Sequence, residues 1–247
     1  MSHNEKMNDD LMIIKQFINI FDDNRIRFND IGWASRAYLI DDGRIVFKFP
    51  RDNEARQDYA REVETLKLIK PHFSNTPKIE WSNENNDYIG FYGVVGEPLD
   101  EEFPSRPNVD QQKVGADLGE FLRELHALTP PDNASKMTLR DVISEHQDKY
   151  KKSSPELRKY LTDVDLRRVD DLFMREMPSK ILELGEKPVF CHGDLQGQNV
   201  IVRDDGSAGI IDFGDAGICD QSIDFAWFEG EILESMLVAY GDDEVLR

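Results

Sequence analysis

Three polar residues in the last quarter of the chain have the types and the spacing that phosphoryl transfer requires. Asp194 and Asn199 stand five positions apart in the run HGDLQGQN, and Asp212 begins the triplet DFG thirteen positions after Asn199. A positioned carboxylate can orient an attacking hydroxyl and accept its proton, while amide and carboxylate oxygens hold Mg²⁺ against the phosphates of a nucleotide. Each run alone is common, but their order across a predicted strand–turn–strand indicates phosphoryl-transfer chemistry.

A lysine in the first third of the chain completes this set. Lys48 lies in the apolar stretch VFKF, and a lysine in a buried strand is costly unless it is paired. The helix that is predicted to follow offers two partners, Glu62 and Glu64. We favour Glu62, because it comes directly before an apolar helix stripe, where the glutamate that holds such a lysine falls.

The first third of the chain has the pattern of a small sheet with two helices. Apolar residues recur every three or four positions between Asp10 and Phe21, which predicts an amphipathic helix. The dipeptide Asp42-Gly43 suits the tight turn of a hairpin. The other elements predicted in this part are strands over 36–40 and 44–49, a helix over 54–69, an extended stretch from Pro77 and a strand over 88–95.

Helical periodicity dominates the remainder, in which we expect several helices between Val109 and Gly185. Two short apolar strands, 199–202 and 209–211, are predicted to form a hairpin. A last amphipathic helix is predicted over 222–240. The composition therefore changes from β-rich to helical, and the change falls between Gly96 and Asp100.

Charge and cysteine content exclude several classes of protein. The 30 basic residues face 49 acidic ones, a formal net charge of −19, whereas a nucleic-acid binder needs clustered Lys and Arg. Cys191 and Cys219 form no disulfide framework and have no partner at metal-ligand spacing, which favours a reduced setting. We see no signal peptide and no apolar run long enough to span a bilayer, so we expect a cytoplasmic protein without a membrane partner.

Together these motifs resemble the aminoglycoside phosphotransferase family, which has a two-lobed protein-kinase-like fold. The resemblance extends from about Asp30 to Tyr240, and its most specific parts are the runs HGDLQGQN and IIDFGD. It implies an α+β fold with a β-rich N-terminal lobe and a mainly helical C-terminal lobe. Residues 1–96 would form the nucleotide-binding lobe with the hinge, and residues 97–247 the lobe with the catalytic loop and the acceptor site.

The resemblance also implies a role for each residue of the set. Asp194 would be the catalytic base, and Asn199 and Asp212 would bind Mg²⁺. Lys48, held by Glu62, would bind the phosphates of ATP or GTP. The choice between the two purines does not follow from the sequence.

Further nucleotide contacts are implied at two places. The stretch from Tyr92 to Val95 resembles the hinge between the lobes, where backbone groups of Gly93 and Val95 would bind the purine. The glycine-rich phosphate loop of protein kinases is absent, and the run IGWASR stands in its place. Ser35 in that run would cover the phosphates. The chain also lacks the Ala-Pro-Glu motif of a protein kinase after DFG.

Acidic residues crowd the end of the chain. From Asp204 to Arg247 there are twelve acidic residues and a single basic one, so more than half of the net charge lies there. Such a surface favours a cationic acceptor, although a solvated acidic face would give the same count. The resemblance implies acceptor binding by three glutamates of the last predicted helix: Glu229, Glu231 and Glu234.

We expect structural roles for four other polar residues. Asp220 and Asp224, and with them Asp215, are expected to brace the catalytic loop by hydrogen bonds. His126 is expected to be a satisfied histidine near the core rather than a ligand.

We therefore expect a small-molecule kinase that transfers the γ-phosphoryl group of ATP or GTP to a hydroxyl of an aminoglycoside-like cationic acceptor, as an antibiotic-modifying kinase would. Two alternatives stay open. One is a metabolic kinase of the same fold that acts on choline, homoserine or a sugar. The other is a catalytically weak nucleotide-binding module, which the short segment after Asp212 suggests. The sequence leaves the oligomeric state open.

Overall fold

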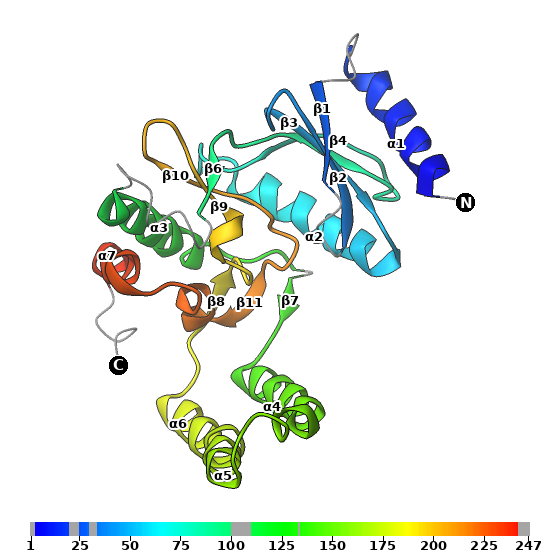
Figure 1. The fold of residues 1–247 in the computed structure, drawn as a ribbon. Coiled ribbons are helices and arrows are strands. Elements are labelled where there is room, and N and C mark those ends of the chain that lie inside the picture. Colours follow the sequence, from blue (N-terminus) through cyan, green and yellow to red (C-terminus); the bar gives the residue numbers. More distant parts are fainter. Residues whose placement is uncertain (1–2, 20–24, 30–33, 100–109, 133, 242–247) are drawn as a thin grey trace.

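The computed structural model of the chain describes residues 3–19, 25–29, 34–99, 110–132 and 134–241, and its first part forms a five-stranded antiparallel sheet (Figure 1). Burial alternates residue by residue along the first, second and fourth strands, as the pleat of a strand requires, whereas three of the four residues of the strand Ile89–Tyr92 are buried. They lie in the order β1-β2-β3-β5-β4. Their bounds are β1 (Ile26–Asn29), β2 (Ser35–Ile40), β3 (Ile45–Pro50), β4 (Lys78–Ser82) and β5 (Ile89–Tyr92).

Two helices, α1 (His3–Phe17) and α2 (Asn53–Ile69), cover opposite faces of this sheet (Figure 1). Ile14 of α1 packs in one buried cluster with Phe47, whereas Val63 of α2 packs in another with Phe91. Because successive residues of a strand point to opposite faces, Phe47 faces α1 and its neighbour Lys48 faces α2.

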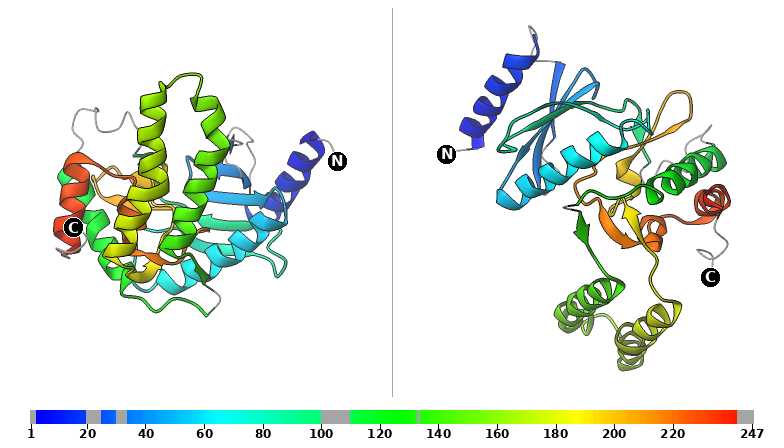
Figure 2. Two further views of the ribbon diagram at one scale, coloured as in Figure 1. Left: turned by 90° about the horizontal axis from the view of Figure 1, so that it is seen from below. Right: turned by 180° about the vertical axis from the view of Figure 1, so that it is seen from behind.

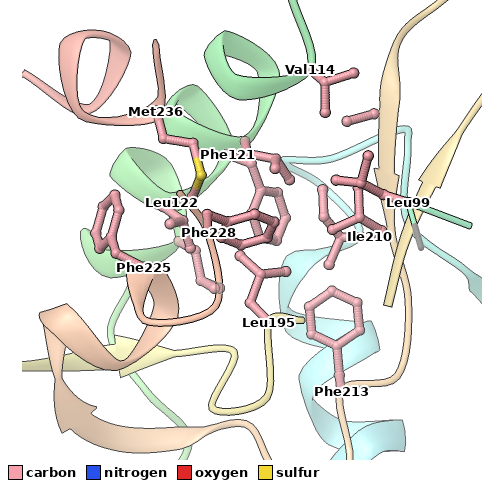
Figure 3. Close-up of a cluster of buried hydrophobic side chains, with 14 of the residues drawn as sticks. Leu99, Val114, Phe121, Leu122, Leu195, Ile210, Phe213, Phe225, Phe228 and Met236 are labelled. Atoms are coloured by element: carbon pink, nitrogen blue, oxygen red, sulfur yellow. The ribbon is translucent and has the colours of Figure 1, made fainter. Parts of the chain in front are cut away.

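The largest core lies in the helical part, between α3 (Gln111–His126) and the chain segments that carry the expected catalytic residues. Figure 3 shows Leu195 and Phe213 pointing into this cluster, and both side chains are fully buried. Each is the direct neighbour of a predicted site residue, Asp194 or Asp212. The core thus anchors both segments from beneath.

Helices α3 and α7 (Gly230–Tyr240) lie side by side (Figure 1). Two glycines of α3 permit the close approach. A Cβ added at Gly115 would lie 2.4 Å from Ile232 O, and one at Gly119 would lie 2.2 Å from Met236 O. No larger residue fits at either position without moving α7.

Two small sheets position the loops of the site. The first has the order β10-β9-β6 and the second the order β7-β11-β8. Asp194 lies between β8 and β9, and Asp212 lies between β10 and β11. The bounds are β6 (Glu97–Pro98), β7 (Ser135–Lys136), β8 (Pro188–Cys191), β9 (Val200–Val202), β10 (Ala208–Ile210) and β11 (Gly217–Asp220), with 3₁₀ turns η4 (Gly197–Asn199) and η5 (Gln221–Phe225).

A separate helical unit projects from the body of the molecule (Figure 2). Its helices contact one another more than they contact the body. The unit consists of α4 (Leu139–Leu157), α5 (Asp163–Asp171), a π-helical turn η3 (Leu172–Glu176) and α6 (Met177–Leu184).

The predicted α+β class, with a β-sheet first part and a helical second part, is confirmed, but one predicted helix is wrong. Residues 222–240 are not one helix: a 3₁₀ turn ends at Phe225, and α7 begins only at Gly230. The break allows the turn to place Asp224 beneath the catalytic loop, and Gly230 takes a φ of +57° that favours glycine. The sequence reasoning also missed the short strands β1, β6, β7, β8 and β11.

Several element ends differ from the predictions. The first helix runs from His3 to Phe17, and Phe21 lies outside the described residues. Strand β5 ends at Tyr92 rather than Val95. Among the described helices, none has the length and apolar character to cross a membrane.

Candidate active site

The Lys48 ammonium group joins the two halves of the site. Its Nζ donates to Glu62 Oε1 and Oε2, at 2.9 and 3.1 Å, and to Asp212 Oδ1 at 2.8 Å. The Lys48 and Glu62 side chains are 13% and 1% exposed, whereas the Asp212 side chain is 51% exposed. The structure therefore pairs Lys48 with Glu62. Glu64, the competing candidate, is exposed and pairs with Lys67 instead.

The three groups control one another's ionisation. Burial by itself would lower the pKa of Lys48, but the charges of Asp212 and Glu62 outweigh burial and raise that pKa. The Lys48 charge is in turn the main cause that lowers the pKa of Asp212. Burial raises the pKa of Glu62 while Lys48 opposes the rise. We treat Glu62 as ionised, because both of its oxygens accept hydrogen bonds from the ammonium group.

Asp212 has an unusual backbone conformation. Its φ is +67°, in the left-handed region that residues other than glycine rarely adopt. The next side chain, Phe213, is fully buried in the core shown in Figure 3. The turn thus buries Phe213 while it directs the Asp212 carboxylate to Lys48, and such local strain is typical of functional sites.

Two side-chain amides hold Asp194. Asn199 Nδ2 donates to the backbone oxygen of Asp194 at 2.8 Å and to its Oδ2 at 3.0 Å. Gln196 Nε2 lies 3.1 Å from Oδ1 and 3.0 Å from Oδ2. Burial raises the pKa of Asp194, the Gln196 hydrogen bond opposes this, and the nearby charges of Asp215 and Asp212 add to the rise.

The oxygen atoms that the site offers suit a hard cation such as Mg²⁺. Lys48 engages Oδ1 of Asp212, and Asn199 turns its Nδ2 toward Asp194. The atoms that these side chains would present to Mg²⁺ are therefore Asp212 Oδ2 and Asn199 Oδ1, both oxygens of the kind Mg²⁺ prefers. The half-exposed Asp212 carboxylate, whose pKa is lowered, is ionised at neutral pH and suits a cation.

Asp224 braces the loop that carries Asp194. This fully buried carboxylate accepts hydrogen bonds from the backbone N–H groups of His192, at 2.8 Å, and Gly193, at 2.9 Å. His126 Nε2 lies 3.1 Å from the same carboxylate, and its Nδ1 lies 2.9 Å from Tyr240 Oη. His126 is thus a satisfied core histidine, as expected.

The two other aspartates that were expected to brace the loop contact it less directly. Asp220 accepts from the backbone N–H groups of Lys187, at 2.7 Å, and Ser222, at 3.0 Å, so it holds the start of β8 rather than the loop. The backbone oxygen of Asp215 lies close to Gly193, where an added Cβ would approach it to 2.4 Å. Gly193 has a φ of +86°, so only glycine suits this position.

The predicted nucleotide contacts lie at opposite ends of β3, with Ser35 paired to Pro50 and Gly93 bonded to Arg44. Tyr59 Oη donates to Ser35 Oγ at 2.8 Å, which ties the expected phosphate cover to α2. Residues 31–33 of that cover lie outside the described residues. The N–H of Gly93 donates to Arg44 O at 3.0 Å, so this residue has only its carbonyl left for a purine. Val95 lies three residues after the end of β5.

The three glutamates predicted to bind the acceptor make no hydrogen bond or ion pair with the other predicted site residues in the described part of the chain. All three lie on or beside α7, which packs along α3 (Figure 1). Glu231 accepts a hydrogen bond from Gln112 Nε2 at 2.7 Å. Glu229 and Glu234 are exposed. Within the described residues, no hydrogen bond or ion pair links any of them to Asp194.

Sequence reasoning missed three residues that contact the site. Gln196 contacts Asp194, Tyr59 contacts Ser35, and Arg61 Nε donates to Gly214 O at 3.1 Å. The spacing of Tyr59 and Glu62, three positions apart in one predicted helix, was a signal that both reach the same face. The Gln196 contact depends on the loop conformation and has no such signal.

Comparisons with known proteins identify the family and the fold. A family model described as the phosphotransferase enzyme family matches residues 25–235. The GDP and kanamycin complex of APH(2")-IIia is 23% identical, covers 96% of this chain and 84% of its own, and has a TM-score of 0.77. The macrolide 2'-phosphotransferase MphH from Brachybacterium faecium is 18% identical over 94% of this chain and 81% of its own, with a TM-score of 0.65.

A further solved structure, choline kinase LicA from Streptococcus pneumoniae, is 15% identical over 98% of this chain and 82% of its own, with a TM-score of 0.63. These likenesses show the two-lobed kinase-like fold that the motifs predicted. The family model extends over most of the chain, including Lys48, Asp194 and Asp212. The chain belongs to the phosphotransferase enzyme family.

Proposed function

We propose that this protein is a small-molecule kinase that moves the γ-phosphoryl group of ATP or GTP to a hydroxyl of a cationic, aminoglycoside-like acceptor. One observation carries the proposal. The Lys48 ammonium lies between Glu62 and Asp212, and the Asp212 charge acts on an Asp194 carboxylate that Asn199 orients. A phosphate-binding cation, oxygen ligands and a carboxylate base are the groups that phosphoryl transfer needs.

Each residue then has a role in the transfer. Asp194 orients the acceptor hydroxyl and takes its proton as the new bond forms between the hydroxyl oxygen and the γ-phosphorus. The bond from that phosphorus to the β-phosphate oxygen breaks, and the nucleoside diphosphate leaves. Lys48 binds the nucleotide phosphates, and Glu62 fixes Lys48. Mg²⁺ held by Asn199 and Asp212 would neutralise charge on the phosphates.

The remaining nucleotide contacts follow the same proposal. Ser35, tied to α2 through Tyr59, covers the phosphates, while the Gly93 carbonyl and the Val95 backbone bind the purine edge. Residues 1–96 act as the nucleotide-binding lobe and residues 97–247 as the lobe that holds the acceptor. The enzyme works in the cytoplasm, where nucleotides are supplied.

The net charge of −19 supports a cationic acceptor. The related structures include complexes with kanamycin, streptomycin and gentamicin. We assign acceptor binding to the exposed Glu229 and Glu234, and to Glu231 once it is released from Gln112. Enzymes that phosphorylate such acceptors confer antibiotic resistance, which is the biological role that we propose.

A metabolic kinase for choline, homoserine or a sugar is the second candidate. The observation that favours it is the position of the α7 glutamates, which no hydrogen bond or ion pair joins to Asp194 in the described part of the chain. A small acceptor would need fewer carboxylates than a polycationic amino sugar. A catalytically weak nucleotide-binding module is the third candidate.

A nucleotide-consumption assay over a panel of aminoglycosides and small alcohols, with ATP and with GTP, tests the proposal. Turnover with an amino sugar supports it, whereas turnover with a small alcohol alone favours the second candidate. Nucleotide binding without turnover on any acceptor favours the third. The variant D194N should lose turnover and keep Mg²⁺-dependent nucleotide binding, whereas D212N should lose the Mg²⁺ dependence of that binding. An active D194N would contradict the assigned base.

A further inference from the structure

The side-chain amide of Gln196 contacts both oxygens of the Asp194 carboxylate. Its Nε2 lies 3.1 Å from Oδ1 and 3.0 Å from Oδ2. Asn199 Nδ2 adds a contact of 3.0 Å to Oδ2. An ionised carboxylate has about four acceptor sites. Two amides therefore occupy three of them within the described part of the chain, and the site that remains is on Oδ1.

The backbone of Gln196 is itself fixed by the loop. Its N–H donates to Asp194 O at 2.9 Å, and its carbonyl accepts from Asn199 N at 2.8 Å. The preceding residue, Leu195, is fully buried in the core (Figure 3). The side-chain amide therefore extends from a rigid base, and the energetic cost of ordering it is low.

Nearby negative charges oppose the ionised form of the Asp194 carboxylate. The charges of Asp212 and Asp215 act on the half-buried Asp194 and repel its carboxylate. An uncharged amide donor stabilises the carboxylate in place without adding a charge that would compete with Lys48 for the phosphates. A hydrogen bond to a charged group is worth about 1.5–3 kcal/mol in general, more than a neutral one.

We propose that Gln196 is a positioning residue, whose amide holds the Asp194 carboxylate so that the remaining acceptor site of Oδ1 faces the acceptor hydroxyl. The inference rests on the proposed kinase function and adds a residue to its machinery. Gln196 acts through Asp194 and does not bind the nucleotide. Its loss should therefore slow transfer and leave nucleotide affinity unchanged.

The substitution Q196L removes both donor contacts at nearly constant volume, and Q196E replaces the amide with a repelling carboxylate. Gln198 provides the matched control, because it is an exposed glutamine of the same loop without a hydrogen bond in the described residues. We expect Q196L to lower kcat about 10- to 100-fold, the range typical of losing a hydrogen-bonded partner that orients a metal ligand. Q196E should lower kcat further, and Q198L should leave it unchanged. The KM for the nucleotide should change in none of them.

Crystal structures of the wild type and of Q196L provide a readout that does not depend on turnover. In Q196L the Asp194 carboxylate should turn away from Asn199 Nδ2. Wild-type kcat in both Gln196 variants, or an unchanged Asp194 orientation in Q196L, would overturn the inference. If the wild type turns over no acceptor, the proposed function fails, and the two crystal structures still decide whether Gln196 orients Asp194. A melting temperature for each variant identifies any failure to fold.

Discussion

Lys48 and Asp212 lie 164 positions apart in the chain, and the ammonium of one lies 2.8 Å from the carboxylate of the other. The same ammonium binds Glu62 of α2, so a strand, a helix and a catalytic turn meet at one nitrogen atom. Glu62 therefore holds Lys48 in place, and the position of α2 determines where the Lys48 ammonium lies.

The substitution E62Q tests this dependence. It removes one of the two carboxylates that hold Lys48, so the lysine should swing toward Asp212 and bind the nucleotide phosphates poorly. We expect turnover to fall about 10- to 100-fold, the range typical of losing a hydrogen-bonded partner that orients a metal ligand. E64Q is the matched control, because Glu64 is exposed on the same helix and pairs with Lys67. Steady-state kinetics decide the matter, and equal rates for both variants would show that Glu62 does not position Lys48.

The close contact of α3 and α7 predicts that replacing Gly119 with alanine destabilises the protein, although helix propensity alone favours alanine over glycine. Replacing a helix glycine with alanine stabilises an open helix by about 1 kcal/mol. At Gly119, however, the added Cβ would lie 2.2 Å from Met236 O. We expect G119A to destabilise the protein by about 1–3 kcal/mol, the usual cost of overpacking.

Urea unfolding of G119A against E120A measures this effect. Glu120 is exposed one position further along α3 and should tolerate alanine. A G119A variant as stable as the wild type would show that α7 can move away from α3 at no cost.

The buried brace beneath the catalytic loop predicts a loss of stability on its removal. The substitution D224A would leave the N–H groups of His192 and Gly193 without their buried acceptor. We expect it to lower the free energy of unfolding by about 3 kcal/mol, since a buried unsatisfied donor costs about 1–3 kcal/mol. Chemical denaturation measures the free energy of unfolding. If D224A lowers it by no more than a surface substitution does, Asp224 does not brace the loop.

The capping box of α5 predicts a pH dependence of stability. Asp165 accepts hydrogen bonds from the side chain of Thr162, at 2.6 Å, and from its backbone N–H, at 3.2 Å, and these bonds lower the pKa of Asp165. The folded state therefore binds fewer protons than the unfolded state. The stabilisation is fully present above the unfolded pKa of about 3.9 and is lost as the pH falls through the lower folded pKa.

The variant D165N removes this titration and should show a shallower fall of the urea midpoint below about pH 4 than the wild type. D163N is the matched control, because Asp163 lies on the same turn, is exposed and takes no part in the capping box. It changes the net charge by the same amount and should keep the wild-type slope. Identical slopes for D165N and D163N would contradict the prediction.

Local sequence patterns predicted the parts of the fold that depend on near neighbours. The Asp42-Gly43 turn and strands β2 and β3 were found within one or two residues, because hairpins form between adjacent segments. The prediction of one helix over 222–240 failed because periodicity does not record that the chain must bring Asp224 beneath a distant loop. Strands β7, β8 and β11 were missed since each is short and pairs with partners far along the chain.

The sequence by itself determined the chemical set, the family and the α+β class, because Asp194, Asn199 and Asp212 stand in motifs whose spacing is local and specific. The sequence favoured Glu62 over Glu64 as the partner of Lys48, and the tertiary structure confirmed it. Tertiary structure alone decided that the N–H of Gly93 is used by Arg44. It also decided that Gln196 holds Asp194 and that Glu231 turns to Gln112. The physical reason is the same in each case. A side chain chooses among several possible partners according to which segments pack beside it, and that packing is a property of the whole chain rather than of its local spacing.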